Sequence, residues 1–138
     1  MVRNILGVLL IEKNSMNKKL KILIAEDERA IAGALNLKLN HVGFDSSVAF
    51  NGREAMDNLQ KEKYDLLILD LIMPQLDGFG VLAEIKEKGI KIPVIVASNL
   101  SQTEDINKAK ELGAVDFFIK SDTPVAEIVE KIKKYFNL

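Results

Sequence analysis

Residues 66–78 read Leu-Leu-Ile-Leu-Asp-Leu-Ile-Met-Pro-Gln-Leu-Asp-Gly, and the first five of them decide the fold. The unbroken apolar run at 66–69 indicates a strand buried on both faces, as in a parallel sheet that helices cover on each side. A carboxylate at the end of such a strand costs free energy unless it has a partner or a chemical task. Asp70 is therefore the first candidate functional residue.

Other strand patterns in this chain also end in polar residues. A run at 20–25 ends in Glu26 and Asp27, a run at 94–97 ends in Ser98, and a run at 116–119 ends in Lys120. The carboxyl ends of parallel strands meet at one edge of an open α/β sheet, and such sheets bind ligands there. We therefore expect three acids, a hydroxyl and an ammonium group to lie together at one edge.

Strand and helix patterns alternate along the chain from residue 19 onward. Strands are predicted at 20–25, about 44–49, 66–69, 94–97 and 116–119, with helices at 28–40, from 51, at 79–87, from 101 to near 113, and from 124 to 136. This alternation predicts an α/β fold with a doubly wound, five-stranded parallel sheet and helices on both faces.

The composition is typical of a single globular domain. The chain has 138 residues, of which 48% are hydrophobic and 28% charged. Its net charge of −1 offers no bulk electrostatic attraction to nucleic acid or to an anionic membrane, so neither is an expected partner. The absence of cysteine excludes disulfides and thiolate zinc sites and is consistent with a reducing, cytoplasmic location.

Residues 1–18 are expected to be an extension, and residues 19–138 the folded domain. The apolar run at 5–11 is far shorter than the roughly 20 residues that span a bilayer, and no small-residue cleavage site follows it. A disordered or loosely attached arm is the favoured interpretation, because chain termini are often disordered. An extra strand or an amphipathic patch that docks on a partner is the alternative.

The polar residues at the sheet edge suit phosphoryl transfer. Glu26, Asp27 and Asp70 would repel one another unless a hard cation such as Mg²⁺ lay among them. One carboxylate could act as a nucleophile, as in enzymes that form an aspartyl phosphate. Lys120 and Ser98 would supply donors to the phosphoryl oxygens.

Four segments together resemble the receiver domain of two-component response regulators, in the single-domain form of the chemotaxis regulators. They are Ile24-Ala25-Glu26-Asp27-Glu28, Asp70-x-x-Met73-Pro74-x-x-Asp77-Gly78, Val94-Ile95-Val96-Ala97-Ser98 and Phe117-Phe118-Ile119-Lys120. The resemblance covers residues 19 to about 136 and implies a flavodoxin-like strand order of 2-1-3-4-5.

The resemblance implies a role for each residue at the sheet edge. Asp70 would be the phospho-acceptor, taking a phosphoryl group from a sensor histidine kinase or a phosphotransfer protein. Asp27, Asp70 and the backbone carbonyl of Ile72 would hold Mg²⁺. Glu26 would complete the metal shell, directly or through water. Lys120 would bridge to the phosphoryl oxygens.

The resemblance also implies a switch formed by Ser98 and Phe117. Ser98 would move to hydrogen-bond the phosphoryl group, and Phe117 would fill the space that its loop leaves, changing the face that binds partners. The chain departs from the family in two places. Phe117 lacks the hydroxyl of the commoner tyrosine, and Ser121 follows Lys120 where the family usually has proline.

Purely structural interpretations of these residues also exist. Glu26 and Asp27 could cap the helix that follows them, and Lys120 could form an ordinary ion pair with Asp70. Asp77 followed by Gly78 is interpreted as a turn in which the acid caps the next helix.

The expected function is that of a stand-alone receiver that acts by binding a separate effector protein. It is not expected to be an enzyme beyond catalysing its own phosphorylation and dephosphorylation. A haloacid-dehalogenase-like phosphatase is rejected, because Arg29 stands where that class has a second acid two residues after the nucleophile. The alternative kept open is a phosphorylation-independent interaction module on a receiver scaffold. The oligomeric state is left open.

Overall fold

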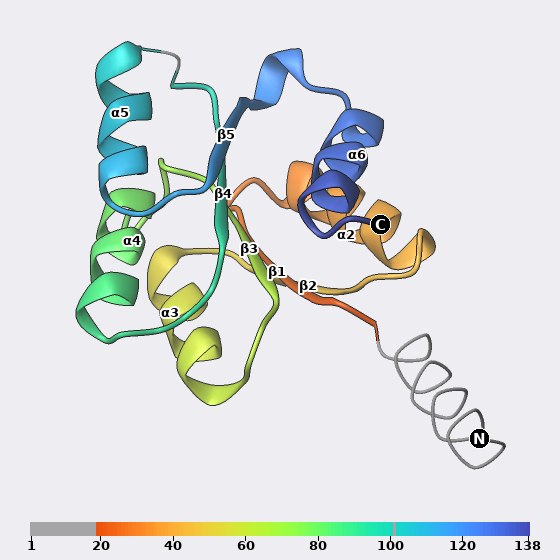
Figure 1. The fold of residues 1–138 in the computed structure, drawn as a ribbon. Helices are drawn as coiled ribbons and strands as arrows, with labels where there is room; N and C mark the ends of the chain where they lie inside the picture. The colour runs from red at the N-terminus through yellow and green to blue at the C-terminus, as the bar shows by residue number, and fades with distance from the viewer. Residues whose placement is uncertain (1–18, 101) are drawn as a thin grey trace, which may run out of the picture.

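The computed structural model describes residues 19–100 and 102–138 (Figure 1). The predicted extension at 1–18 lies outside these residues. The described part alternates strand and helix throughout, as predicted. Its strands are β1 (Lys21–Ala25), β2 (Asp45–Ala49), β3 (Leu66–Leu69), β4 (Val94–Ser98) and β5 (Asp116–Ile119). Its helices are α2 (Arg29–His41), α3 (Gly52–Lys61), α4 (Gly78–Glu87), α5 (Thr103–Glu111) and α6 (Val125–Tyr135), with a short 3-10 helix η1 (Lys120–Asp122).

The strands form one parallel sheet in the order β2-β1-β3-β4-β5, which confirms the predicted fold class and strand order. Helices α3, α4 and α5 cover one face of the sheet, and α2 and α6 cover the other (Figure 1). The strand β3 is central and fully buried. Leu67 and Leu69 belong to the apolar cluster on the α3–α5 face, and Leu66 and Ile68 to the cluster on the α2–α6 face.

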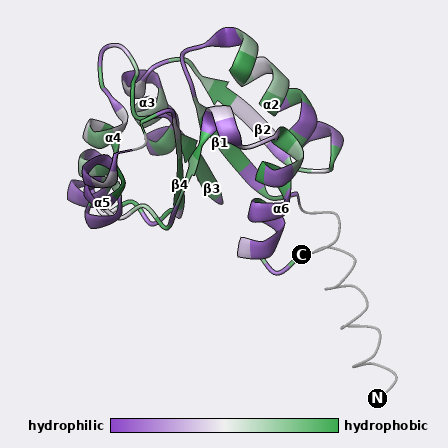
Figure 2. Ribbon diagram, turned by 90° about the horizontal axis from the view of Figure 1, so that it is seen from above, coloured by the Kyte–Doolittle hydropathy of each residue, from purple (hydrophilic) through white to green (hydrophobic). Residues whose placement is uncertain are grey.

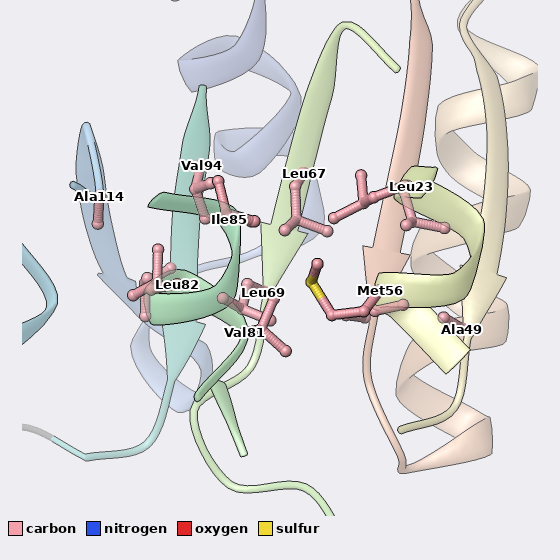
Figure 3. Close-up of a cluster of buried hydrophobic side chains, with 14 of the residues drawn as sticks. Leu23, Ala49, Met56, Leu67, Leu69, Val81, Leu82, Ile85, Val94 and Ala114 are labelled. Atoms are coloured by element: carbon pink, nitrogen blue, oxygen red, sulfur yellow. The ribbon is translucent and has the colours of Figure 1, made fainter. Parts of the chain in front are cut away.

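The first of these clusters joins the sheet to α3 and α4. In Figure 3, Leu69 of β3 lies beside Val81 of α4, Leu67 of β3 lies beside Ile85 of α4, and Met56 of α3 lies in the same cluster. Apolar residues concentrate on the central strands, whereas polar residues lie along the helices (Figure 2). This packing fixes where each strand ends, and so where the polar residues that follow the strands are placed.

Helix caps confirm part of the local prediction. The N–H of Glu54 donates to Asn51 Oδ1 at 2.8 Å, and the N–H of Gly80 donates to Asp77 Oδ1 at 2.8 Å. The boundaries of α5 and α6 differ from the prediction, because these helices begin at Thr103 and Val125. The 3-10 helix η1 was not predicted, because three residues carry no periodic pattern. None of the helices in the described ranges combines the length and the apolar character needed to cross a membrane.

Candidate functional site

The sheet register brings Glu26 and Asp70 side by side. Ala25 of β1 pairs with Leu69 of β3, so the next residue on each strand is an acid at the same edge. The N–H of Asp70 donates to the carbonyl of Ala25 at 3.0 Å, which extends the ladder by one step. Asp27 completes a group in which one carboxylate oxygen from each acid lies within 4.8 Å of the others. The three predicted acids are thus brought together.

Two of these acids are buried. Glu26 is 4% exposed and Asp70 is 5% exposed, whereas Asp27 is more accessible. Burial of a carboxylate is unfavourable unless it accepts hydrogen bonds or has a charged partner. Glu26 Oε2 accepts from the N–H of Glu28 at 3.1 Å, and Asp70 Oδ1 accepts from the N–H of Ile72 at 3.3 Å. The backbone of Ile72 therefore lies beside the candidate acceptor.

Lys120 joins the two buried acids. Its Nζ lies 2.6 Å from Glu26 Oε1 and 3.1 Å from Asp70 Oδ2. The ion pair with Asp70 was predicted, and the shorter one with Glu26 was not. Burial alone would lower the pKa of the Lys120 ammonium, but the hydrogen bond that it donates to Glu26 and the negative charge of Asp70 outweigh burial and raise that pKa. Lys120 is thus held in its charged form at the centre of the site.

The surroundings of Glu26 change its acidity strongly. Burial raises the pKa of its carboxyl from the ordinary 4.5 to about 7, with a further upward contribution from the charge of Asp70. The hydrogen bonds from Lys120 and from the N–H of Glu28 oppose this rise without cancelling it. In the metal-free protein, Glu26 therefore binds a proton more tightly than it does in the unfolded chain.

This shift predicts how metal-free stability depends on pH. A raised folded-state pKa favours the folded protein below pH 4.5, and that contribution is lost as the pH rises through about 7. Between pH 5 and pH 8, we expect the free energy of unfolding of wild type to fall by about 2 kcal/mol more than that of Glu26→Gln, because the glutamine side chain does not titrate. Urea unfolding of both proteins at several pH values, with a chelator present, measures the difference. Parallel curves for the two proteins would contradict the shift.

The donor set fits Mg²⁺. Glu26, Asp27 and Asp70 offer only carboxylate oxygens, and the accessible position of Asp27 leaves room for the waters that Mg²⁺ usually keeps. Glu26, Asp27 and Asp70 would hold the metal. The resemblance to the family implies that the backbone carbonyl of Ile72 would join them.

The predicted switch residues lie on neighbouring strands. Ser98 ends β4, is fully buried, and its Oγ accepts from the N–H of Leu100 at 3.3 Å. Among the described residues it makes no hydrogen bond to the acids. Phe117 of β5 is partly buried against the apolar cluster on the α3–α5 face and pairs with Val96. The structure thus places both residues on the adjoining strands, but does not bring either into the acid cluster.

Two glycines that pack against the segment from Asp70 to Leu76 were missed as parts of the site. A Cβ on Gly78 would lie 2.3 Å from the carbonyl oxygen of Asp70, and a Cβ on Gly52 would lie 1.9 Å from the carbonyl oxygen of Leu76. The loop after β3 therefore rests on the first turns of α3 and α4. Gly78 was interpreted only as part of a turn. No sequence signal indicated the contact between Gly52 and Leu76, because it joins segments that are distant in the chain.

Comparison with known proteins identifies the family. The family model described as "Response regulator receiver domain" matches residues 22–133. The chain is 30% identical to the receiver domain of a Francisella response regulator, with a TM-score of 0.81, covering 86% of this chain and 98% of that one. It shares the fold of a CheY-like receiver domain protein from Methanospirillum hungatei JF-1, with a TM-score of 0.81 and 21% identity over 87% of this chain and 95% of that one. The chain belongs to the response regulator receiver domains.

Curated relatives are longer than this chain. The "Probable transcriptional regulator ycf27" of Porphyridium aerugineum is 37% identical over 107 residues, which are 78% of this chain and 44% of the relative. The "Transcriptional regulatory protein DltR" of Streptococcus agalactiae serotype III (strain NEM316) is 34% identical over 101 residues, 73% of this chain and 45% of the relative. The chain thus spans less than half the length of these relatives.

Proposed function

We propose that this receiver takes a phosphoryl group onto Asp70 and thereby changes which partner it binds. The observation that carries the proposal is the arrangement around Asp70, whose Oδ2 lies 3.1 Å from Lys120 Nζ within a cluster of three carboxylates. Buried acids paired with a lysine at strand ends suit a nucleophile whose product carries extra negative charge. The donor would be a phosphohistidine on a sensor histidine kinase or a phosphotransfer protein.

In the transfer, a carboxylate oxygen of Asp70 forms a bond to phosphorus while the bond from phosphorus to the donor imidazole nitrogen breaks. The imidazole leaves with the bonding electron pair and is then protonated. Lys120 turns from the carboxylate of Asp70 toward the phosphoryl oxygens, which still lie within its reach. When bound, Mg²⁺ would neutralise negative charge on the phosphoryl oxygens. Loss of the group is attack of water on phosphorus, which returns Asp70 and inorganic phosphate.

The signal would then pass from Asp70 to Ser98 and Phe117. The Ser98 hydroxyl accepts a hydrogen bond from the N–H of Leu100 and keeps its own proton free to donate to a phosphoryl oxygen once its loop moves toward Asp70. Movement of that loop would change the packing of Phe117 and so the outer surface formed by α5, β5 and α6. We propose that an effector protein binds this surface in one state only. The stand-alone arrangement and the cytoplasmic location stay predictions. We further propose that the chain is not an enzyme in any other sense.

Intact mass spectrometry tests phosphoryl uptake. The wild-type protein is incubated with acetyl phosphate and Mg²⁺, and in parallel with an excess of chelator. We expect a mass increase of one phosphoryl group only with Mg²⁺, and its loss under mild alkali or hydroxylamine, which cleave acyl phosphates. Absence of any increase, together with absence of Mg²⁺ binding, would contradict the proposal and favour a phosphorylation-independent interaction module.

The lifetime of the phosphoryl group should depend on the apolar rim of the site. Ile72 is 60% exposed beside Asp70, and Leu100 lies two residues after Ser98. Neither side chain can orient a water for attack on phosphorus. We expect the double variant Ile72→Asn and Leu100→Glu to lose the phosphoryl group about tenfold faster, less than a fully positioned base provides. Mass spectra taken after donor removal measure the rate, and an unchanged or slower loss would contradict the expectation.

A further inference from the structure

The hydrogen-bonded ladder between β4 and β5 ends beside two residues of the site. Ser98 of β4 pairs with Ile119 of β5, the residue before Lys120. Beyond this pair, Asn99 and Leu100 continue from β4, while residues 120–124 lead from β5 to α6 (Figure 1). Ser98 and Lys120, the two residues proposed to contact the phosphoryl oxygens, thus lie where the strands end and the loops begin.

A side chain links these loops just past the end of the ladder. Asn99 Oδ1 accepts a hydrogen bond from the backbone N–H of Ser121 at 2.9 Å. Asn99 directly follows Ser98, and Ser121 directly follows Lys120 within η1. Both residues are exposed, so either side chain can be changed without opening the apolar core.

The backbone N–H that donates this hydrogen bond is present because residue 121 is not proline. Proline has no N–H, and it restrains the backbone through its own ring instead. This chain has serine at position 121, so the backbone N–H is present. In this protein, therefore, a hydrogen bond from the neighbouring loop can restrain the segment after Lys120.

Restraint of this segment matters most while the phosphoryl group is being transferred to Asp70. In this structure the Lys120 ammonium forms ion pairs with Glu26 at 2.6 Å and with Asp70 at 3.1 Å. Phosphorylation makes one Asp70 oxygen the bridging atom of an acyl phosphate and requires the ammonium to follow the phosphoryl group. A flexible lysine side chain samples many positions around its Cα. A displaced backbone therefore lowers the fraction of time in which the ammonium contacts the phosphoryl oxygens.

We propose that Asn99 is a positioning residue for Lys120, acting through the N–H of Ser121. This inference rests on the proposed function, because it concerns the same phosphoryl transfer to Asp70. Asn99 touches neither the donor nor the acids, and its effect on the reaction passes through the backbone that carries Lys120. The same bond makes the loops of Ser98 and Lys120 move together.

The test compares phosphorylation rates with acetyl phosphate and Mg²⁺ in four proteins. Asn99→Leu keeps the approximate volume but removes the acceptor, and we expect a rate about three- to tenfold lower, the range that a single hydrogen bond supports. Asn99→Asp keeps an acceptor oxygen and should restore most of the rate. Ser121→Ala removes only a hydroxyl, keeps the N–H, and should match wild type. Hydrogen exchange of the Ser121 amide should be faster in Asn99→Leu alone.

A double-mutant cycle separates positioning from general damage. In a Lys120→Gln background, Asn99→Leu should cause no further loss of rate, and Mg²⁺ affinity should be the same with and without the Asn99 change. Equal rates in wild type and Asn99→Leu, additive losses with Lys120→Gln, or a parallel loss of Mg²⁺ affinity would each overturn the positioning role while leaving phosphorylation of Asp70 intact. Failure of wild type to take up any phosphoryl group would overturn both proposals.

Discussion

The variant Asp70→Asn should take up no phosphoryl group from acetyl phosphate. The amide has nearly the same shape as the carboxylate but lacks the nucleophilic oxygen, so the bond to phosphorus cannot form. We expect the rate of uptake to fall by about a thousandfold or more, as when a covalent nucleophile is removed from other proteins. The measurement is intact mass over time, at equal protein and Mg²⁺ concentrations.

The fold of this variant should persist. Lys120 keeps its 2.6 Å contact with Glu26 when the charge of Asp70 is lost, so no buried cation is left without a partner. Asp45→Asn provides the matched control, because Asp45 is an exposed aspartate at the start of β2, away from the site edge. The control should be phosphorylated like wild type. Uptake by Asp70→Asn at the wild-type rate would show that another residue is the acceptor.

The acid cluster could be predicted from the sequence because strand patterns and a parallel sheet leave little freedom. Once the apolar runs at 20–25 and 66–69 are adjacent parallel strands, Glu26 and Asp70 must emerge at the same edge. The register of Ala25 with Leu69 then places them side by side. The candidate acceptor and its neighbouring acids therefore followed from local patterns together with the strand order that the family resemblance implied.

The supporting contacts could not be predicted in the same way. The second partner of Lys120, the link from Asn99 to Ser121 and the contact of Gly52 with Leu76 all depend on the paths of loops after the strands end. Loop paths have no periodicity from which a sequence pattern could place them. The same limit applies to the hydrogen bond that Ser98 Oγ accepts from the N–H of Leu100, because it lies in the loop after β4.

The second large effect is expected from Gly78→Ala, at the base of the acceptor loop. The new Cβ would lie 2.3 Å from the carbonyl oxygen of Asp70 and 2.7 Å from the Cα of Leu71. Both are backbone atoms, so no side-chain rotation relieves the contact, and the chain that carries the acceptor has to move. We expect a loss of about 1–3 kcal/mol in the free energy of unfolding. A displacement of this size should also slow phosphorylation about a hundredfold in the protein that remains folded.

Gly33→Ala is the matched control for this effect. Gly33 lies within α2, and a Cβ there would meet no atom within 4 Å. Alanine in a helix interior is more favourable than glycine, so this control should gain about 0.5–1 kcal/mol of stability and keep the wild-type rate. Urea unfolding gives the stabilities, and intact mass gives the rates under conditions where circular dichroism shows each protein to be folded. Wild-type stability and rate in Gly78→Ala would mean that the backbone of Asp70 tolerates displacement, and that close packing against α4 does not position the acceptor.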